Sequence, residues 1–355
     1  MSIDSRPAPA LGQTSREVLL SLAGLWLGDE LYEESAALLA HCADHLRSGL
    51  LPTRWPLSSA DRERDPIASL YFVEAVRLLV AYGRSQRWVE SSVYDAVLDT
   101  VRTLSHGSRD AGMDDDGLFV VRGQKTIAAQ ALWHNALRTA ADLALARNSA
   151  LLSAELKVLA KRSRDVTEKH FWREKEGFLV KSLDDLSLVP ESLLSLSLGY
   201  PMLDRAHATR HCEMVRKELL TPHGLRTVAR SHAAYDGGII TRLSATGAVM
   251  PMWLGAYARA LVFARGSLVE ARDEIAQAIT PLLDAHSQDD LVLDMPEAFT
   301  DDAAHTAIGR VTFPPSRAEL LRAHDECLLG QGPSPEHVER PPSLVPLAMR
   351  WEVEI

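Results

Sequence analysis

Apolar residues recur at three- and four-residue spacing along most of the chain, which is the pattern of amphipathic helices. Only short pieces near residues 178–183 and 291–293 have the character of strands. The predicted helices, about eleven in number, cover residues 16–28, 31–48, 67–83, 91–107, 126–146, 150–170, 189–199, 204–220, 252–261, 267–286 and 316–329. There is neither βαβ alternation nor a heptad run. The pattern therefore predicts an all-α fold, and a toroid of helical hairpins is the economical way to bury the apolar faces.

The helical pattern continues without an internal flexible linker. A chain of 355 residues can bury one large core. We therefore expect one α/α toroid domain over residues 1–329. The remaining residues, 330–355, carry five prolines before Leu347 and are expected to form an extended wrap along the surface.

Composition and charge exclude several classes of protein. The net charge of −10 gives no general attraction to phosphate backbones, so no nucleic-acid partner is expected. No apolar run reaches the roughly 18 to 20 residues of a membrane span. The first residues have neither the basic end nor the apolar stretch of a signal peptide, so a cytoplasmic location is expected. Cys42, Cys212 and Cys327 are far apart and indicate buried thiols. We expect no metal and no cofactor.

A polar loop between two apolar helices, within residues 219–261, is the first candidate for a functional site. Loops held by a rigid scaffold carry much of the function of proteins. This loop contains Arg226, Arg230, Tyr235 and Asp236.

Six motifs in order resemble a known family. They are GLLPTR (49–54), QALWHNAL (130–137), HFWREKEGFL (170–179), LLTPHGLRT (219–227), MPMWLGAY (250–257) and MPEAFTDD (295–302). Together they resemble the glucosidase domain at the C-terminal end of glycogen debranching enzymes. The resemblance spans about residues 16–329 and implies a six-hairpin α/α toroid.

The sugar-contact motifs of that family are altered here. Its Trp-Gly-Arg-Asp-Thr motif corresponds to residues 14–18, which keep Arg16 and Glu17. Its Ser-Ala-Asp-Ala motif corresponds to residues 65–68, with the acid displaced to Asp65. The loop that carries the family's general acid is missing after residues 118–121. Three further places differ from the family's pattern. Ala128 stands where the family has Glu, and Val189-Pro190-Glu191-Ser192 stands where it has Arg-Pro-Asn-Gln. Residues 243–248 stand where it has Tyr-His-Gln-Gly-Thr.

One carboxylate of the family remains. The resemblance implies that Glu297 is the general base that activates water, although it could instead cap the segment that follows. We expect Glu297, Asp301 and Asp236 to be catalytic. The expected substrate-binding residues are Arg16, Glu17, Asp65, His134, Arg226, Arg230, Tyr235, Trp253, Asp302 and His305.

The predicted function depends on the absence of the loop that carries the family's general acid. Inverting glycosidases need one carboxyl group to protonate the leaving oxygen and another to activate water. Without the first, we predict a base-assisted substitution, cyclisation or elimination on a small polar metabolite that loses sulfate or phosphate. Arg16, Arg226 and Arg230 would hold that anion, and the reaction could belong to natural-product biosynthesis. The alternatives are a true α-glucosidase and a non-catalytic sugar-binding or scaffold subunit.

The count of helices is one short of the twelve in six hairpins. An open toroid would expose an apolar seam at Leu22, Leu25 and Trp26, and such a patch marks an interaction site. The sequence therefore predicts that a partner subunit or a second copy of the chain closes the ring.

Overall fold

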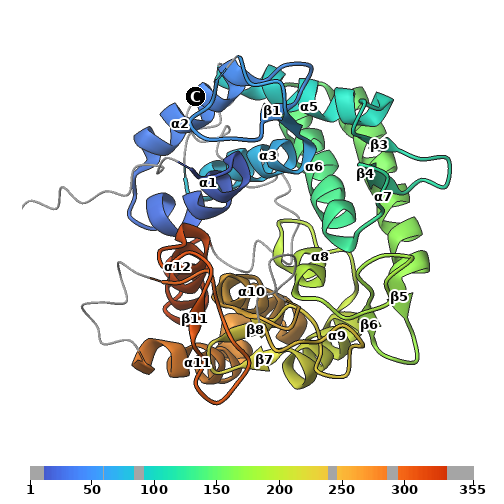
Figure 1. Cartoon of the computed structure of the whole chain (residues 1–355). Helices are drawn as coiled ribbons and strands as arrows, with labels where there is room; N and C mark the ends of the chain where they lie inside the picture. The colour runs from blue at the N-terminus through green and yellow to red at the C-terminus, as the bar shows by residue number, and fades with distance from the viewer. Residues whose placement is uncertain (1–11, 59, 84–91, 239–245, 286–294, 334–355) are drawn as a thin grey trace, which may run out of the picture.

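Six helices form a closed inner ring in the structure, a computed structural model that describes residues 12–58, 60–83, 92–238, 246–285 and 295–333 (Figure 1). In chain order the inner helices are α1 (Ser15–Leu22), α3 (Pro66–Ala81), α6 (Ile127–Ala146), α8 (Leu194–Ser197), α10 (Leu254–Arg265) and α12 (Pro314–Arg322). Each packs against the next, and α12 packs against α1. Short turns of π-helix follow α1 and α12, and turns of 3-10 helix precede α8 and α10; they span Ala23–Leu27, Ala323–Leu328, Pro190–Leu193 and Pro251–Trp253.

Five further helices lie outside the ring: α2 (Tyr32–His45), α5 (Tyr94–His106), α7 (Ala150–Phe171), α9 (Arg205–Glu218) and α11 (Leu268–Ala285). Helix α2 packs on α3, α5 and α7 pack on α6, and α9 and α11 pack on α10. Inner and outer helices alternate along the chain, so the predicted α/α toroid with eleven helices is confirmed for the described residues. None of these helices has the length and apolar character needed to cross a membrane.

The inner helices are buried nearly all round, as expected for helices enclosed by others. In α10 every residue from Leu254 to Ala264 is buried. At Gly24, a β-carbon would lie 2.0 Å from the backbone oxygen of Ala318, so only glycine allows this approach of the end of α1 to α12. Of the three residues predicted to form the seam, Leu22 and Leu25 are 2% and 5% exposed, and Trp26 is partly buried against the core. The predicted open seam is therefore wrong, and the observation behind a ring-closing partner subunit disappears with it.

Short antiparallel strands connect the helices. Three pairs form hairpins, namely β1 (Leu51–Pro52) with β2 (Arg64–Asp65), β3 (Ala111–Met113) with β4 (Phe119–Val121), and β5 (Trp172–Arg173) with β6 (Phe178–Leu179). A five-stranded sheet has the order β11-β10-β9-β8-β7, from Ala307–Ile308, Ala298–Phe299, Val249–Met250, Gly224–Arg226 and Leu220–Thr221. The extended piece predicted at 178–183 begins as β6, whereas the strand predicted at 291–293 lies outside the described residues, as does most of the expected C-terminal wrap.

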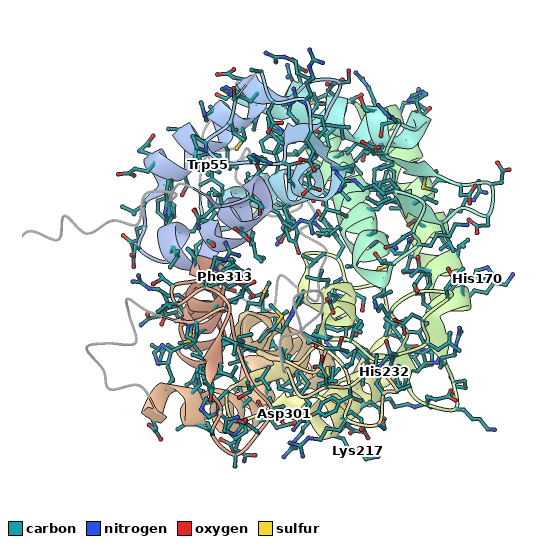
Figure 2. All side chains as sticks on the ribbon, in the orientation of Figure 1. Trp55, His170, Lys217, His232, Asp301 and Phe313 are labelled. Atoms are coloured by element: carbon teal, nitrogen blue, oxygen red, sulfur yellow. The ribbon has the colours of Figure 1, made fainter. Side chains whose placement is uncertain are left out.

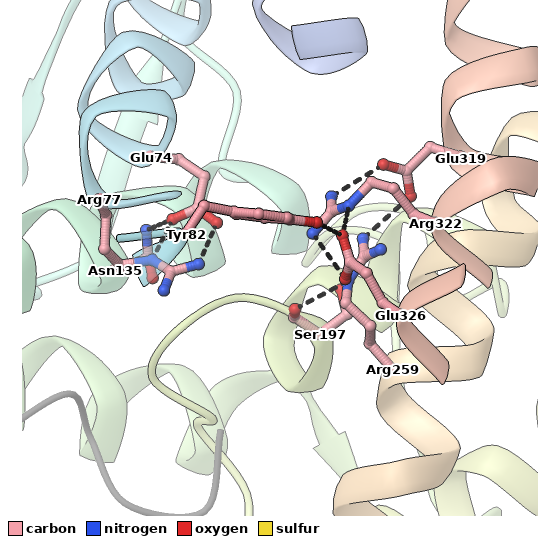
Figure 3. A network of polar contacts seen from close by, with 9 residues as sticks. All are labelled: Glu74, Arg77, Tyr82, Asn135, Ser197, Arg259, Glu319, Arg322 and Glu326. Carbon is pink, nitrogen blue, oxygen red and sulfur yellow. Dashed lines mark hydrogen bonds and ion pairs between the residues drawn. The ribbon is translucent and has the colours of Figure 1, made fainter. Parts of the chain in front are cut away.

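Charged side chains pair with one another inside the ring (Figure 3). The Arg322 guanidinium donates to Glu319 and Glu326 at 2.6 to 3.3 Å, and Arg259 donates to the other oxygen of Glu319 at 2.9 Å. The Tyr82 hydroxyl donates to Glu326 at 2.5 Å. We call these five residues the buried network. It joins α10 to α12 and the turn that follows it, and Tyr82 connects it to the end of α3.

Candidate functional site

The N-terminal ends of the inner helices meet at one end of the ring, which we call the mouth. Residues from the C-terminal halves of α1 and α12 and from the middle of α3 line one cavity, together with residues at α8 and around the start of α10. The lining residues are Leu19, Leu20, Tyr71, Glu74, Leu78, Leu194, Leu198, Met252, Trp253, Ala256, Arg259, Glu319 and Arg322. The cavity has a volume of about 20 Å³, which is room for a water molecule and too little for a sugar ring. A sugar would therefore have to bind above it, at the mouth.

At the mouth, Arg310 connects two of the predicted site residues. Its Nη1 and Nη2 atoms donate to both carboxylate oxygens of Glu17 at 3.0 and 2.6 Å. Its Nε donates to Oε2 of Glu297 at 3.1 Å, and its backbone N–H donates to the same oxygen at 3.2 Å. We call Glu17, Arg310 and Glu297 the Arg310 bridge. It places the predicted base beside the first turn of α1.

The two carboxylates of the bridge are held in different ways. Glu17 also closes a capping box with Thr14 at the start of α1. Its burial opposes ionisation, but hydrogen bonds from Arg310 and Thr14 lower its pKa below the ordinary value. Glu297 is about one-third exposed, and among the described residues only Arg310 donates to it, always at Oε2. Its Oε1 can therefore accept a proton from water.

A glycine makes room for Glu297. Gly309 has φ +77, and a β-carbon there would lie 3.0 Å from Oε2 of Glu297. Both the backbone conformation and the space thus favour glycine at this position.

Arg16 and Asp65 form a second pair at the mouth. One nitrogen of Arg16 donates to both oxygens of Asp65, at 3.1 and 2.9 Å. Asp65 also caps α3, because its Oδ1 accepts from the backbone of Ile67 at 2.9 Å. Arg16 remains about half exposed. Asp65 thus supports the scaffold, while Arg16 keeps nitrogen atoms accessible to solvent.

Asp301 joins three other predicted residues, at the edge of the molecule shown in Figure 2. Arg226 and Arg230 each donate to both of its oxygens, at 2.5 to 3.1 Å, and the Tyr235 hydroxyl donates at 2.5 Å. Burial alone would raise the pKa of Asp301, but these donors hold it well below the usual range. A carboxylate with five donors is poorly suited to accept a proton. The cluster instead fixes residues 226–235 to the segment that follows β10.

The remaining acids of the predicted set stabilise turns. Asp236 accepts from the backbone of Gly238 at 2.9 Å. Asp302 accepts from Thr300 and from the backbone of Ala304 and His305 at 2.8 to 3.1 Å, and the Thr300 hydrogen bond leads the effects that lower its pKa. The His305 ring stacks on His223 at 4.3 Å.

Two predicted binding residues lie on or immediately before inner helices. His134 is buried, and its Nδ1 lies 3.0 Å from the backbone oxygen of Ala160 in α7. It therefore faces the outer helix rather than the cavity, and burial lowers its pKa to about 4. Trp253 lines the cavity, and its indole N–H is buried without a hydrogen-bond partner in the described part of the chain.

Glu191, which our sequence analysis did not select, has a different environment from the other acids. It stands in the turn before α8, one turn ahead of the cavity-lining residue Leu194. Its Oε2 is shielded from solvent and has no hydrogen-bond partner among the residues described. Burial raises its pKa above the ordinary value, against weaker opposing effects that include the charge of Lys181. The signal in the sequence was an acid between apolar residues at the start of an inner helix.

Comparison with known proteins agrees with this arrangement. A family model described as amylo-alpha-1,6-glucosidase matches residues 11–129 and 122–322. No curated protein sequence matches the chain. A wild-type glycosidase structure is similar with a TM-score of 0.62 and 16% identity, over 90% of this chain and 88% of that one. A glycosidase variant in complex with glucose gives 0.60 and 16%, over 92% and 91%. A bacterial glucoamylase complexed with acarbose gives 0.64 and 12%, over 92% and 50%. At these identities the structures show a shared fold.

Proposed function

Because the chain belongs to the amylo-alpha-1,6-glucosidase family, we propose that it hydrolyses an α-glucosidic bond and that Glu297 is the base. The observation that carries this proposal is the Arg310 bridge at the mouth. A general base must be ionised and must present an oxygen to its proton donor. Glu297 presents such an oxygen, because Arg310 contacts only its Oε2 and the side chain is partly exposed, and the adjacent guanidinium is a partner suited to a carboxylate.

In this proposal the substrate binds across the mouth, above the small cavity. Arg16 is the exposed cation there and would contact sugar hydroxyls. Trp253 would donate its unpaired indole N–H. Asp301 acts indirectly, by fixing the loop that contains Arg226, Arg230 and Tyr235.

The alternative with an anionic leaving group has less support. It requires arginines that can receive sulfate or phosphate. Yet Arg226 and Arg230 both donate in bidentate fashion to Asp301, and Arg16 donates to Asp65. An anion would have to compete with a carboxylate already bound at each position. A role in natural-product biosynthesis stays a prediction.

The decisive substrate is α-D-glucosyl fluoride, because fluoride leaves without a proton donor and thus tests the base alone. We expect the wild-type protein to release fluoride and glucose. Glu297→Gln should lower kcat by at least about 100-fold, which is the usual contribution of a general base. Glu155→Gln, on the exposed face of α7, is the matched control and should keep the wild-type rate.

Two results would reject the proposal. One is a wild-type protein that releases no fluoride above the spontaneous rate. The other is a Glu297→Gln variant that is as active as the wild type. The first result would favour a non-catalytic subunit, and the second would mean that another group acts as the base.

A further inference from the structure

We propose that Glu191 is the proton donor of this site and replaces the general acid whose loop the chain lacks. The inference rests on the proposed function and extends it to substrates with poor leaving groups. A sugar alkoxide leaves slowly unless its oxygen is protonated in the transition state, so a hydrolase of ordinary glucosides needs such a donor.

The position of Glu191 fits this role. In the inner ring, α8 stands three places from α1 in either direction, so the two helices face each other across the cavity (Figure 1). Both line it, α1 through Leu19 and Leu20 and α8 through Leu194 and Leu198. Glu297 lies beside the first turn of α1, and Glu191 lies just before the first turn of α8. The two residues therefore stand at the starts of inner helices on opposite sides of the ring, the placement from which an inverting hydrolase can flank a bond with two carboxyl groups.

Tyr71 is a cavity-lining residue near enough to Glu191 to be affected by its charge. Tyr71 comes from α3, and burial raises its pKa, with smaller effects from the charges of Arg16, Glu319, Glu191 and Glu74. The sequence neighbour of Arg16, Glu17, belongs to the Arg310 bridge. The charged and titratable groups that face Glu191 are Lys181, from the segment after β6, and Tyr71.

The other acids at the ring are unsuitable because each has a cationic partner. Asp65 pairs with Arg16, Glu17 with Arg310, Glu74 with Arg77, and Glu319 and Glu326 with Arg322. An adjacent guanidinium favours the ionised carboxylate. Glu191 has no such contact in the described residues, and burial favours its protonated form. Glu297, which Arg310 contacts, and Glu191, which has no cationic partner among these residues, thus stand in different electrostatic environments.

Water is the only reactant that the proposed reaction needs besides the glucoside. Glu297 takes a proton from water as the water oxygen bonds to the anomeric carbon. The bond between that carbon and the glycosidic oxygen breaks, and its electron pair stays on the departing oxygen. That oxygen receives the proton of Glu191. The products are glucose of inverted anomeric configuration and an alcohol, and solvent returns one proton to Glu191 and takes one from Glu297.

The test compares two substrates that differ in their need for an acid. Glu191→Gln should lower kcat/KM for maltose and isomaltose by about 10² to 10⁴-fold. For α-D-glucosyl fluoride the same variant should stay within about threefold of the wild type, because fluoride needs little protonation. Glu297→Gln should lose activity on every substrate. Glutamine preserves the shape of a protonated glutamic acid, so the thermal transition should remain close to that of the wild type.

A second measurement uses the unmodified protein. The pH profile of kcat/KM for maltose should fall on the basic side through one ionisation, and the profile for the fluoride should lack this decrease. The proposal is overturned if Glu191→Gln keeps full activity on maltose. It is also overturned if the variant loses maltose and fluoride activity equally, which would indicate a structural role. Neither result decides the role of Glu297, which is tested separately by fluoride release from Glu297→Gln.

Discussion

The buried network allows a quantitative prediction for Arg322. Its guanidinium is the only group that contacts both Glu319 and Glu326 within the described residues, and all three side chains are less than 8% exposed. In Arg322→Met, the two carboxylates would remain buried without this cation. Removing one partner of a buried ion pair costs about 3–5 kcal/mol. Dividing this free energy by the entropy of unfolding, about 2.1 cal/mol/K per residue for a chain of this length, gives a fall in Tm of roughly 4–7 °C.

The pH dependence of Tm is a more specific test of the role of Arg322. Burial opposes the ionisation of Glu326, but Arg322 and Arg259 lower its pKa overall in the folded protein. A carboxyl with a depressed pKa stabilises the fold above its unfolded pKa and loses this effect as the pH falls. In Arg322→Met, burial becomes the dominant effect and the pKa of Glu326 rises. Protonation of Glu326 at low pH then removes part of the free-energy cost of the substitution. The Tm difference between wild type and variant should therefore shrink from pH 7 to pH 5.

Calorimetry or circular dichroism would measure both effects. Arg164→Met is a suitable control, because Arg164 is exposed and pairs only with its neighbour Asp165 among the described residues, and its Tm should change by about 1 °C or less. Adding Glu326→Gln to Arg322→Met should recover part of the lost stability. Our reasoning would be refuted if Arg322→Met lowered Tm no more than the control, or if the difference grew at lower pH.

Two further predictions concern the proposed base and the buried histidine His134. Gly309→Ala should lower kcat for α-D-glucosyl fluoride at least tenfold, because its β-carbon would displace the Glu297 carboxylate; Gly83→Ala, at φ +107 with open space around it, controls for backbone strain and should keep the wild-type rate. His134 has a folded pKa of about 4, well below the ordinary value, so its contribution to stability is complete above pH 6.5 and is lost as the pH falls toward 4. In urea titrations His134→Gln should reduce the stability lost between pH 7 and pH 5 by about 2 kcal/mol, and an unchanged loss would contradict the assignment.

Helix positions were predictable from the sequence because inner and outer helices keep their periodicity over many turns. The ranges predicted for α6 and α7 differ from the structure by at most about one residue at each end. The five-stranded sheet was not predicted, because its strands of two or three residues are too short to show alternation. The closed ring was not predicted, because the number of helices does not show that α12 packs on α1. The close approach at Gly24, in the turn after α1, is visible only in the structure.

Site residues were harder to predict, because their roles depend on contacts between distant segments. Asp301 and Glu297 are four residues apart in one motif, yet two arginines engage Asp301 while Arg310 contacts Glu297 through one oxygen. No local pattern distinguishes these environments. Glu191 was passed over for the same reason, since the absence of a partner is a property of the folded chain.

The Arg310 bridge also constrains how the protein can become functional during synthesis. Glu17 and Arg310 are 293 residues apart, so the cation that positions Glu297 reaches α1 only when the last inner helix has docked. Such a non-local contact forms late, after the local hairpins. A chain still on the ribosome, or one truncated before α12, would possess most of the toroid but no assembled base. Under the proposed function, hydrolytic competence would appear in a single step at the end of folding, and activity would then report complete ring closure.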